Sequence, residues 1–417
     1  MPPQTIVERI LSRHAGRAVV AGEIAVCRAD IVIGTDGSGP MAIDYFERMG
    51  GRALFDASRI CFSLDHYAPP DTPSTQAFHR RIRDFAGKHG ATVFEVGEGI
   101  SHQVAVERGL VAPGDLVLGA DSHTVMCGAV NACAIGVGSS DLAAAMMTGQ
   151  AWLRVPETIR VHLAGTRPPS LAAKDIALAL VHEIGSDGAN YQAIEFAGDA
   201  LELLTLEDRL VISSLMVEAG AKVAVFPFDA RTADYRRGRA GRPGQPVEPD
   251  SAARYVREVR CDLSVLTPRV ALPHAPDNVV PLAAAAGAAV QMVFIGTCTG
   301  GRAVDVRDAW RAFVQAGGRL AEGLQLVITP ASREVLDEIS ADGTLANLTA
   351  AGATVTMAGC GACCGTSGVI PADGMTVLST ANRNFKARMG NATAVIYLAS
   401  PAVCGAAAAT GRIPERA

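Results

Sequence analysis

The amino-acid sequence predicts an α/β fold built from three domains. Short apolar runs typical of buried strands alternate with alanine-rich stretches typical of helices, the pattern that parallel sheets covered by helices produce. Apolar residues make up 49% of the chain and aromatic residues only 5%, which favours helices packed on sheets over an aromatic-rich β-sandwich. The 417 residues exceed the size at which one hydrophobic core stops growing, so several domains are expected.

The elements can be placed from the apolar periodicity. Ile6, Ile10 and Leu11 follow helical spacing, so residues 1–17 are expected to form an amphipathic helix and not a secretory leader. No repeat of fixed period is visible. The predicted strands are residues 60–64, 93–96, 116–118, 159–163, 223–226, 293–295, 325–328 and 395–398.

Proline-rich and charged segments indicate where the domains meet. One boundary is expected near 155–157 and another in 266–276, which holds three prolines. Residues 231–250, with five arginines, three prolines and three glycines, are interpreted as a solvated loop or linker. The predicted α/β domains are 1–160, 161–268 and 269–417, the last carrying the cysteines discussed below.

Charge and hydropathy exclude several classes of protein. A net charge of -5 leaves no overall basic field, so neither nucleic acid nor an anionic membrane surface is an expected partner. The longest apolar run, 279–290, is too short to span a bilayer. We therefore expect a soluble, cytoplasmic protein. In that compartment thiols stay reduced, and six of the ten cysteines are expected to be buried apolar residues: Cys27, Cys61, Cys127, Cys133, Cys261 and Cys404.

Acidic and imidazole side chains follow the predicted strands. Asp65 and His66 come after strand 60–64, His102 follows the β-like run 98–100, and Asp121 with His123 comes after strand 116–118. Ligands bind at the carboxyl ends of parallel strands, and a carboxylate beside an imidazole raises its pKa, as a general acid requires. The structural alternative is that Asp121 caps a helix and that His123 is a bonded loop residue.

Three cysteines do not fit the pattern of buried apolar residues. Cys360 and Cys363 form a Cys-x-x-Cys pair, and Cys298 follows strand 293–295. Three thiolates can hold a four-iron cluster and leave one iron open as a Lewis acid. A zinc site would need four ligands and a redox dithiol two, and both remain alternatives. Cys364 is interpreted as the spare thiol, because ligands two residues apart embrace a metal more easily than neighbours.

Two arginines lie shortly after the cysteine pair. Arg383 and Arg388 are five residues apart in a polar segment. Guanidinium groups bind carboxylates bidentately, so they are candidates for holding an acidic substrate. Solvated surface arginines are the alternative.

Taken together, these motifs resemble the aconitase superfamily, in particular the separate large subunits of the isopropylmalate dehydratase and homoaconitase type. The resemblance runs nearly end to end. It rests on residues 64–66, 99–103, 119–138, 174–176, 195–198, 218–222, 295–302, 360–365, 382–390 and 397–401.

The resemblance implies three α/β domains around a 4Fe-4S cluster, and it assigns residues to three roles. The implied cluster ligands are Cys298, Cys360 and Cys363. The implied acid/base and cluster-surrounding residues are Asp65, His66, His102, Asp121, His123 and Glu218. The implied substrate-binding residues are Arg383, Arg388 and Ser122.

It also implies a hydro-lyase that works with a partner. The swivelling fourth domain of one-chain aconitases is expected to be absent from this chain and to be a separate small subunit that supplies the proton-removing serine. The implied substrate is a small hydroxy acid such as 2-isopropylmalate. Homocitrate, homoaconitate, maleate, citraconate and dimethylmalate remain alternatives, because Gly300 and Ser214 stand where the family carries asparagines.

Two functions of other classes remain open. One is a non-catalytic zinc or redox protein, in which Cys360 and Cys363 act alone and His66 is not needed. The other is an iron-responsive RNA-binding regulator, which the acidic balance disfavours.

Overall fold

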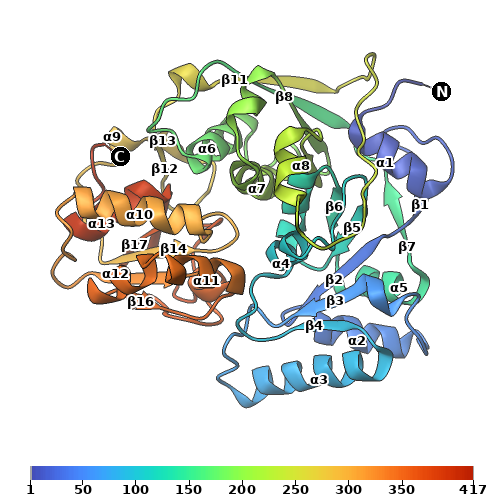
Figure 1. Cartoon of the computed structure of the whole chain (residues 1–417), viewed down its shortest axis with the longest axis horizontal. Helices are drawn as coiled ribbons and strands as arrows, with labels where there is room; N and C mark the ends of the chain where they lie inside the picture. The colour runs from blue at the N-terminus through green and yellow to red at the C-terminus, as the bar shows by residue number, and fades with distance from the viewer. Residues whose placement is uncertain (1, 417) are drawn as a thin grey trace.

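The computed structural model describes residues 2–416, which form four sheets with helices packed around them (Figure 1). The five-stranded sheet is parallel and has the order β4-β3-β2-β5-β6. Its strands are β2 (Ile31–Thr35), β3 (Ile60–Ser63), β4 (Thr92–Phe94), β5 (Leu116–Gly119) and β6 (Cys133–Gly136). The helices of this part are α1 (Ile6–Ala15), α2 (Gly39–Arg48), η1 (Ala57–Arg59), α3 (Pro73–His89), α4 (Ser101–Glu107), η2 (Ser122–Val130) and α5 (Ser139–Thr148).

Helix α1 forms where the apolar spacing predicts it. Thr5 accepts a hydrogen bond from the Glu8 backbone, and the Glu8 side chain accepts one from the Thr5 backbone, which closes a capping box. Ile6, Ile10 and Leu11 are buried on one face. The expected amphipathic helix is therefore confirmed, and it begins five residues inside the range 1–17.

The four-stranded sheet is also parallel, with the order β10-β9-β8-β11. Its strands are β8 (Thr158–Ala164), β9 (Ala193–Ala197), β10 (Val223–Val225) and β11 (Arg257–Asp262), and its helices are α6 (Ala173–Ile184), η3 (Asp199–Leu203), α7 (Leu206–Leu215), η4 (Met216–Ala219), α8 (Ala230–Arg236) and η5 (Leu263–Val265). A two-stranded antiparallel ribbon joins β1 (Ile24–Arg28) to β7 (Gln150–Arg154).

The four- and five-stranded sheets share one hydrophobic core. Buried residues such as Ile33 of β2 and Ile194 of β9 belong to the same apolar cluster. Gly128 makes this packing possible, because a Cβ there would lie 1.8 Å from the Ala224 carbonyl oxygen of β10. The division at residue 160 remains a prediction.

The seven-stranded sheet has the order β13-β12-β18-β17-β14-β15-β16 and lies in the orange and red half of Figure 1. Its strands are β12 (Arg269–Ala271), β13 (Val279–Pro281), β14 (Met292–Gly296), β15 (Gln325–Thr329), β16 (Thr354–Val355), β17 (Thr376–Ser379) and β18 (Val395–Ala399). Strand β12 runs antiparallel to both neighbours, whereas the other pairs are parallel. The helices are α9 (Leu282–Ala285), α10 (Ala303–Gln315), α11 (Arg333–Ala341), α12 (Thr344–Ala350), η6 (Gly361–Cys364) and α13 (Pro401–Thr410).

The structure differs from the expectation for residues 231–250 and agrees with the expectation for the six isolated cysteines. The interpretation of 231–250 as a loop throughout is wrong, because helix α8 occupies its start, where Asp229 caps the helix through the Thr232 backbone. The remainder of this segment lies against the first part of the chain, where the Gln245 backbone N–H donates to the Pro113 carbonyl (2.8 Å). The six cysteines expected to be apolar core residues are all buried. Across residues 2–416, none of the helices combines the length and apolar character that crossing a bilayer demands.

Candidate active site

The carboxyl edges of two sheets meet at one place and bring the candidate residues together. In the five-stranded sheet, adjacent strands β3, β2 and β5 lead into Asp65-His66, Asp36 and Asp121-Ser122-His123. In the seven-stranded sheet, adjacent strands β17 and β14 lead into Asn382-Arg383 and Cys298. The Cys360 backbone N–H donates to the Asp65 carbonyl (2.9 Å) and ties the two edges together.

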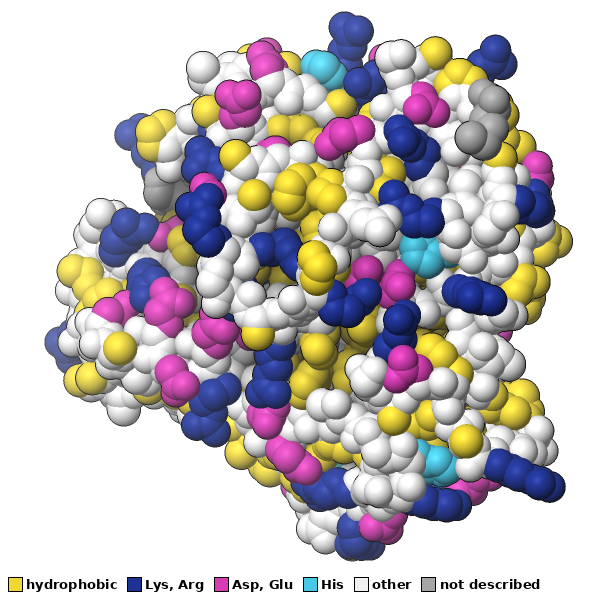
Figure 2. Space-filling view, turned by 45° about the vertical axis from the view of Figure 1, so that its right-hand side comes forward, with side chains coloured by type: hydrophobic (Ala, Val, Ile, Leu, Met, Phe, Trp, Pro, Cys, Tyr) yellow, Lys and Arg dark blue, Asp and Glu magenta, His cyan; other side chains and the backbone are white. Residues whose placement is uncertain are grey.

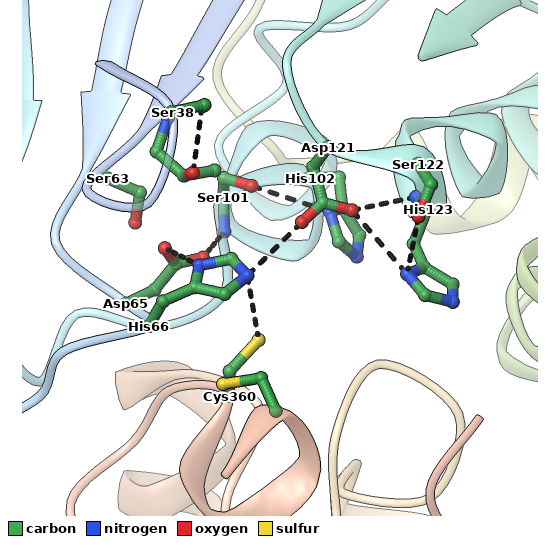
Figure 3. A network of polar contacts seen from close by, with 12 residues as sticks. Ser38, Ser63, Asp65, His66, Ser101, His102, Asp121, Ser122, His123 and Cys360 are labelled. Carbon is green, nitrogen blue, oxygen red and sulfur yellow. Dashed lines mark hydrogen bonds and ion pairs between the residues drawn. The ribbon is translucent and has the colours of Figure 1, made fainter. Parts of the chain in front are cut away.

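His66 occupies the centre of the polar network (Figure 3). Its Nδ1 lies 2.8 Å from Asp65 Oδ1, and its Nε2 lies 3.3 Å from Asp121 Oδ2 and 3.7 Å from Cys360 Sγ. Because carboxylates accept hydrogen bonds, both ring nitrogens donate, as only the imidazolium can. Burial alone lowers the pKa of His66, but the neighbouring Cys360 sulfur and the carboxylates of Asp65 and Asp121 raise it well above the usual value. The structure thus holds a charged proton donor at the Cys360 sulfur.

Asp121 connects the two imidazoles of the site. Its Oδ1 accepts a hydrogen bond from the His123 backbone N–H (2.7 Å), and its Oδ2 accepts from His66. Burial raises the pKa of Asp121, but hydrogen bonds from His123 and His66 hold it well below the usual range. The helix-cap alternative is therefore partly correct, because Asp121 caps η2 while also contacting His66.

A second chain of contacts runs from His123 to Arg383. His123 Nε2 lies 3.1 Å from Glu218 Oε1. Burial alone lowers the pKa of His123, but hydrogen bonds to Asp121 and Glu218 raise it to about 9. Glu218 accepts from Arg383 Nε through both oxygens (2.8 and 3.0 Å), and Arg383 Nη2 donates to Ser122 Oγ (3.1 Å). These contacts fix the direction of the Arg383 guanidinium group, and the Arg383 side chain remains 23% exposed.

The three candidate ligand cysteines each face a nitrogen donor. Asn382 Nδ2 donates to Cys298 Sγ (3.2 Å), Arg388 Nη2 donates to Cys363 Sγ (3.7 Å), and His66 Nε2 faces Cys360. N–H groups directed at sulfur stabilise the thiolate form, which is the form that binds metal. The donor set therefore fits a cluster held by three thiolates.

The thiols differ in acidity before any metal binds. Burial raises the pKa of Cys298, but His102 and His123 lower it to about 5. Burial raises the pKa of Cys360 well above the usual value despite the neighbouring imidazole of His66. Loading this site with metal must therefore displace a proton from Cys360.

Unpartnered polar atoms lie beside the same cysteines. Within residues 2–416, His102 Nε2 and Arg388 Nε are buried and have no hydrogen-bond partner. Buried polar groups normally find partners, so these two atoms are consistent with an additional group at the site. Cys364 is different, because its Sγ lies 2.7 Å from Thr366 Oγ1.

Asp65, His66 and Cys360 also offer ligand atoms within 4.8 Å of one another. They could hold a single metal ion, as the zinc interpretation requires. However, Asp65 uses Oδ1 for His66 and Oδ2 for the Ser101 backbone N–H (2.8 Å). Both oxygens of the Asp65 carboxylate are therefore already hydrogen-bonded, and one of them orients the His66 imidazole.

The two positions that depart from the resembled family have distinct surroundings. Ser214 Oγ lies 3.4 Å from Cys298 Sγ, so a hydroxyl takes the place of one amide. At Gly300, a Cβ would lie 2.2 Å from Thr380 Cβ. The side chain of Thr380 thus fills the space that a larger residue at position 300 would need.

The structure refines the expected surroundings of one residue and adds residues that the sequence did not single out. The β-like run before His102 is an isolated β-bridge at Gly99, and His102 itself lies in the first turn of α4. Asp36 accepts hydrogen bonds from the His66 backbone (2.9 Å) and His79 Nε2 (2.9 Å). Its position directly after β2 could have identified it. Asn382 was seen only as part of the arginine segment, and no local signal shows that its amide reaches Cys298.

A cavity of about 380 Å³ opens beside the network. Asp121 and Ser122 line it together with Val137, Val217 and Lys222. On the face drawn in Figure 2, basic side chains are interspersed with acidic ones and are not gathered into one patch.

Comparisons with known proteins agree with this arrangement. The model of the aconitase family (aconitate hydratase) matches residues 8–411. A Methanopyrus kandleri protein named 3-isopropylmalate dehydratase large subunit 1 is 42% identical over 413 residues, covering 99% of this chain and 98% of its own. A Deinococcus radiodurans protein of the same name is 43% identical, covering 99% and 93%.

A solved structure shares the fold. The crystal structure of Thermococcus kodakaraensis aconitase X superposes with a TM-score of 0.50 at 13% identity, covering 86% of this chain and 84% of that one. The predicted α/β fold of aconitase type is thereby confirmed. The chain belongs to the aconitase family.

Proposed function

We propose that this chain is the large subunit of an iron-sulfur hydro-lyase that removes water from, and returns it to, a small 2-hydroxy dicarboxylic acid. The observation that carries the proposal is the placement of His66 Nε2, 3.7 Å from Cys360 Sγ and 3.3 Å from Asp121. A charged proton donor beside a metal-binding sulfur is what protonation of a departing hydroxide requires. The relatives named 3-isopropylmalate dehydratase large subunit 1 support an isopropylmalate as the model substrate.

Cys298, Cys360 and Cys363 are the proposed ligands of a 4Fe-4S cluster. With three cysteine ligands, such a cluster supplies one open iron that acts as a Lewis acid toward a hydroxyl and a carboxylate. The nitrogen donors at all three sulfurs support this assignment. We also retain the division into domains 1–160, 161–268 and 269–417 as part of the proposal.

His66 is the proposed general acid. Asp65 accepts the hydrogen bond from Nδ1 (2.8 Å) and so directs Nε2 toward the cysteines. Asp121 stabilises the imidazolium from the other side. The proton given up at Nε2 would leave a neutral ring that keeps its hydrogen bond to Asp65, so the side chain need not move between turnovers.

Arg383 is the proposed anchor for a substrate carboxylate. Glu218 and Ser122 hold its guanidinium group in one direction, and His123 braces Glu218. Preorganised donors lose little conformational entropy when a carboxylate binds. Arg388 and the unpartnered Nε2 of His102 would contact substrate or cluster from the Cys363 and Cys298 sides.

A separate small subunit is the proposed partner. It would cover the site and supply the base that removes the carbon-bound proton. Homoaconitase activity and hydration of maleate, citraconate or dimethylmalate remain the alternatives. Ser214 and the Gly300-Thr380 contact are the observations that keep them open, because both lie beside the Cys298 loop.

The experiment is a substrate panel. The chain would be reconstituted with iron and sulfide without oxygen, combined with a small subunit of an isopropylmalate dehydratase, and assayed for the ultraviolet absorbance of unsaturated acids. We expect turnover of 2-isopropylmalate or one of the alternatives by the complex and none by this chain alone. A fully loaded complex that converts no acid of the panel would contradict the proposal.

A further inference from the structure

Lys174 is a buried cation that has no role in the proposed mechanism. It lies in the first turn of α6, is 1% exposed, and extends into the third part of the chain. Its Nζ donates to Thr299 Oγ1 (3.1 Å) and to the carbonyls of Thr380 (2.8 Å) and Ala381 (2.6 Å). No ion pair within residues 2–416 involves this ammonium group.

The three acceptors belong to the two loops that surround Cys298. Thr299 follows Cys298 directly, and Thr380 and Ala381 lead directly into Asn382. Each N–H of the ammonium group therefore holds one of these two segments in place. A lysine that reaches from α6 thus fixes the distance between the Cys298 loop and the Asn382 loop.

The contacts continue from Thr299 to the sulfur. The Thr299 hydroxyl, which accepts from Lys174, contacts the Thr380 carbonyl oxygen (3.0 Å) and, more closely, Asn382 Oδ1, which the Thr297 hydroxyl also contacts (3.2 Å). With Oδ1 occupied by these hydroxyls, the amide nitrogen of Asn382 must point the other way. It donates to Cys298 Sγ at 3.2 Å.

A buried charge without a counter-charge is costly even after the surrounding protein relaxes. Burial lowers the pKa of Lys174 to about 8, whereas the neighbouring Cys298 and Cys363 sulfurs and the Asp305 carboxylate oppose that decrease. The group is therefore still mainly charged near pH 7. Negative charge at Cys298 and Asp305 contributes to compensating for its burial, and a negatively charged group held by the cysteines would add to it.

We propose that Lys174 is a positioning residue and the buried counter-charge of the cluster: it orients Asn382 toward Cys298 through Thr299 and raises the reduction potential of the bound cluster. The inference rests on the proposed function, because it requires that Cys298, Cys360 and Cys363 hold the cluster. A nearby cation and N–H donors to sulfur both favour the more negative, reduced state of a cluster.

The test is a redox titration followed by EPR, on full-length protein reconstituted without oxygen. Lys174→Met should lower the midpoint potential relative to the unmodified protein. Lys386→Met is the matched control, since Lys386 lies in the arginine segment but is exposed. The shift at Lys174 should be about four times larger or more, the ratio of effective dielectric constants of roughly 80 in water and 20 in the protein.

Two further variants separate charge from orientation. Thr299→Val keeps the ammonium group but removes the hydroxyl link, and should give a smaller shift in the same direction. Lys174→Arg should restore most of the potential. If Lys174→Met holds no cluster, retention by Lys174→Arg supports the counter-charge, and loss from both variants overturns it.

The outcomes also separate this inference from the proposed function. If the unmodified protein takes up no iron and sulfide, the proposed function fails first. If it takes them up and Lys174→Met shifts the potential no more than Lys386→Met, only the role of Lys174 is overturned. An unchanged potential in Thr299→Val overturns the orientation of Asn382 through Thr299.

Discussion

At the carboxyl edge of the five-stranded sheet, acids and imidazoles bond to one another, whereas at the edge of the seven-stranded sheet the sulfurs accept N–H groups from outside their own loop. Asp65, His66 and Asp121 form a connected network that needs no further group. Around Cys298 and Cys363, by contrast, His102 Nε2 and Arg388 Nε have no partner within residues 2–416. The carboxylate–imidazole network of the first edge is satisfied within itself, whereas the unpartnered nitrogens near the cysteines of the second edge support the proposed cluster.

The largest expected effect tests the second edge directly. Cys298→Ser should lose most iron and sulfide and reduce kcat by at least about a hundredfold, because metal catalysis is worth several kcal/mol. Iron and labile-sulfide content and the turnover of the two-subunit complex measure this. Cys364→Ser is the matched control and should keep the cluster, because its thiol contacts Thr366. A cluster lost from the control and kept by Cys363→Ser would reverse the ligand assignment.

The next effect tests the first edge. His66→Gln should reduce kcat by roughly 10²–10⁴, the usual contribution of a positioned acid, and leave the iron content unchanged. Asp65→Asn should cause a smaller loss, since the amide oxygen still accepts from Nδ1 but no longer stabilises the imidazolium. Full activity in His66→Gln with a normal cluster would show that the proton comes from another group.

Arg383 follows a strand of the seven-stranded sheet and contacts Ser122 at the edge of the five-stranded sheet, so a substitution there tests both edges. Arg383→Lys keeps the charge but loses the contacts that Glu218 and Ser122 make with the planar guanidinium group. KM for the acid should rise about tenfold or more, in line with 1.5–3 kcal/mol for a charged hydrogen bond. Steady-state kinetics with constant cluster content provide the measurement. An unchanged KM would remove Arg383 from the substrate site.

The smallest effect concerns the packing of Gly300, in the loop that carries Cys298, against Thr380. Gly300→Ala should lower the free energy of unfolding by about 1–3 kcal/mol, as overpacking does, because the new Cβ would lie 2.2 Å from Thr380 Cβ. The control is Gly87→Ala in α3, where no atom lies within 4 Å of the added Cβ; it should stabilise by about 0.5–1 kcal/mol. Chemical denaturation measures both. An equal response would contradict the packing described at Gly300.

Much of the fold and part of the site followed from the sequence, for identifiable reasons. All eight predicted strands are present, because buried parallel strands are short apolar runs with polar ends. Asp65, His66 and Asp121 meet as expected, because adjacent parallel strands place their carboxyl ends together. Local patterns were sufficient where one strand leads directly into one polar residue.

Long-range contacts were the part that sequence could not supply. Lys174 binds Thr299 and Thr380 across 125 and 206 residues of sequence, and nothing in the helical pattern of α6 identifies their carbonyl and hydroxyl oxygens. Nor does any pattern show that Thr380 occupies the space beside Gly300. Helix α8 was missed because arginine, proline and glycine nearby outweighed the Asp229 cap.

The most direct test is the iron and sulfide content of the site formed by Cys298, Cys360 and Cys363, and its response to mild oxidation. Protein reconstituted without oxygen should hold about four irons and four sulfides per chain, and oxidation should release about one iron and produce the EPR signal of a three-iron cluster, because one corner lacks a cysteine ligand. Zinc without labile sulfide, or a cluster that releases no iron, would contradict the proposed cluster.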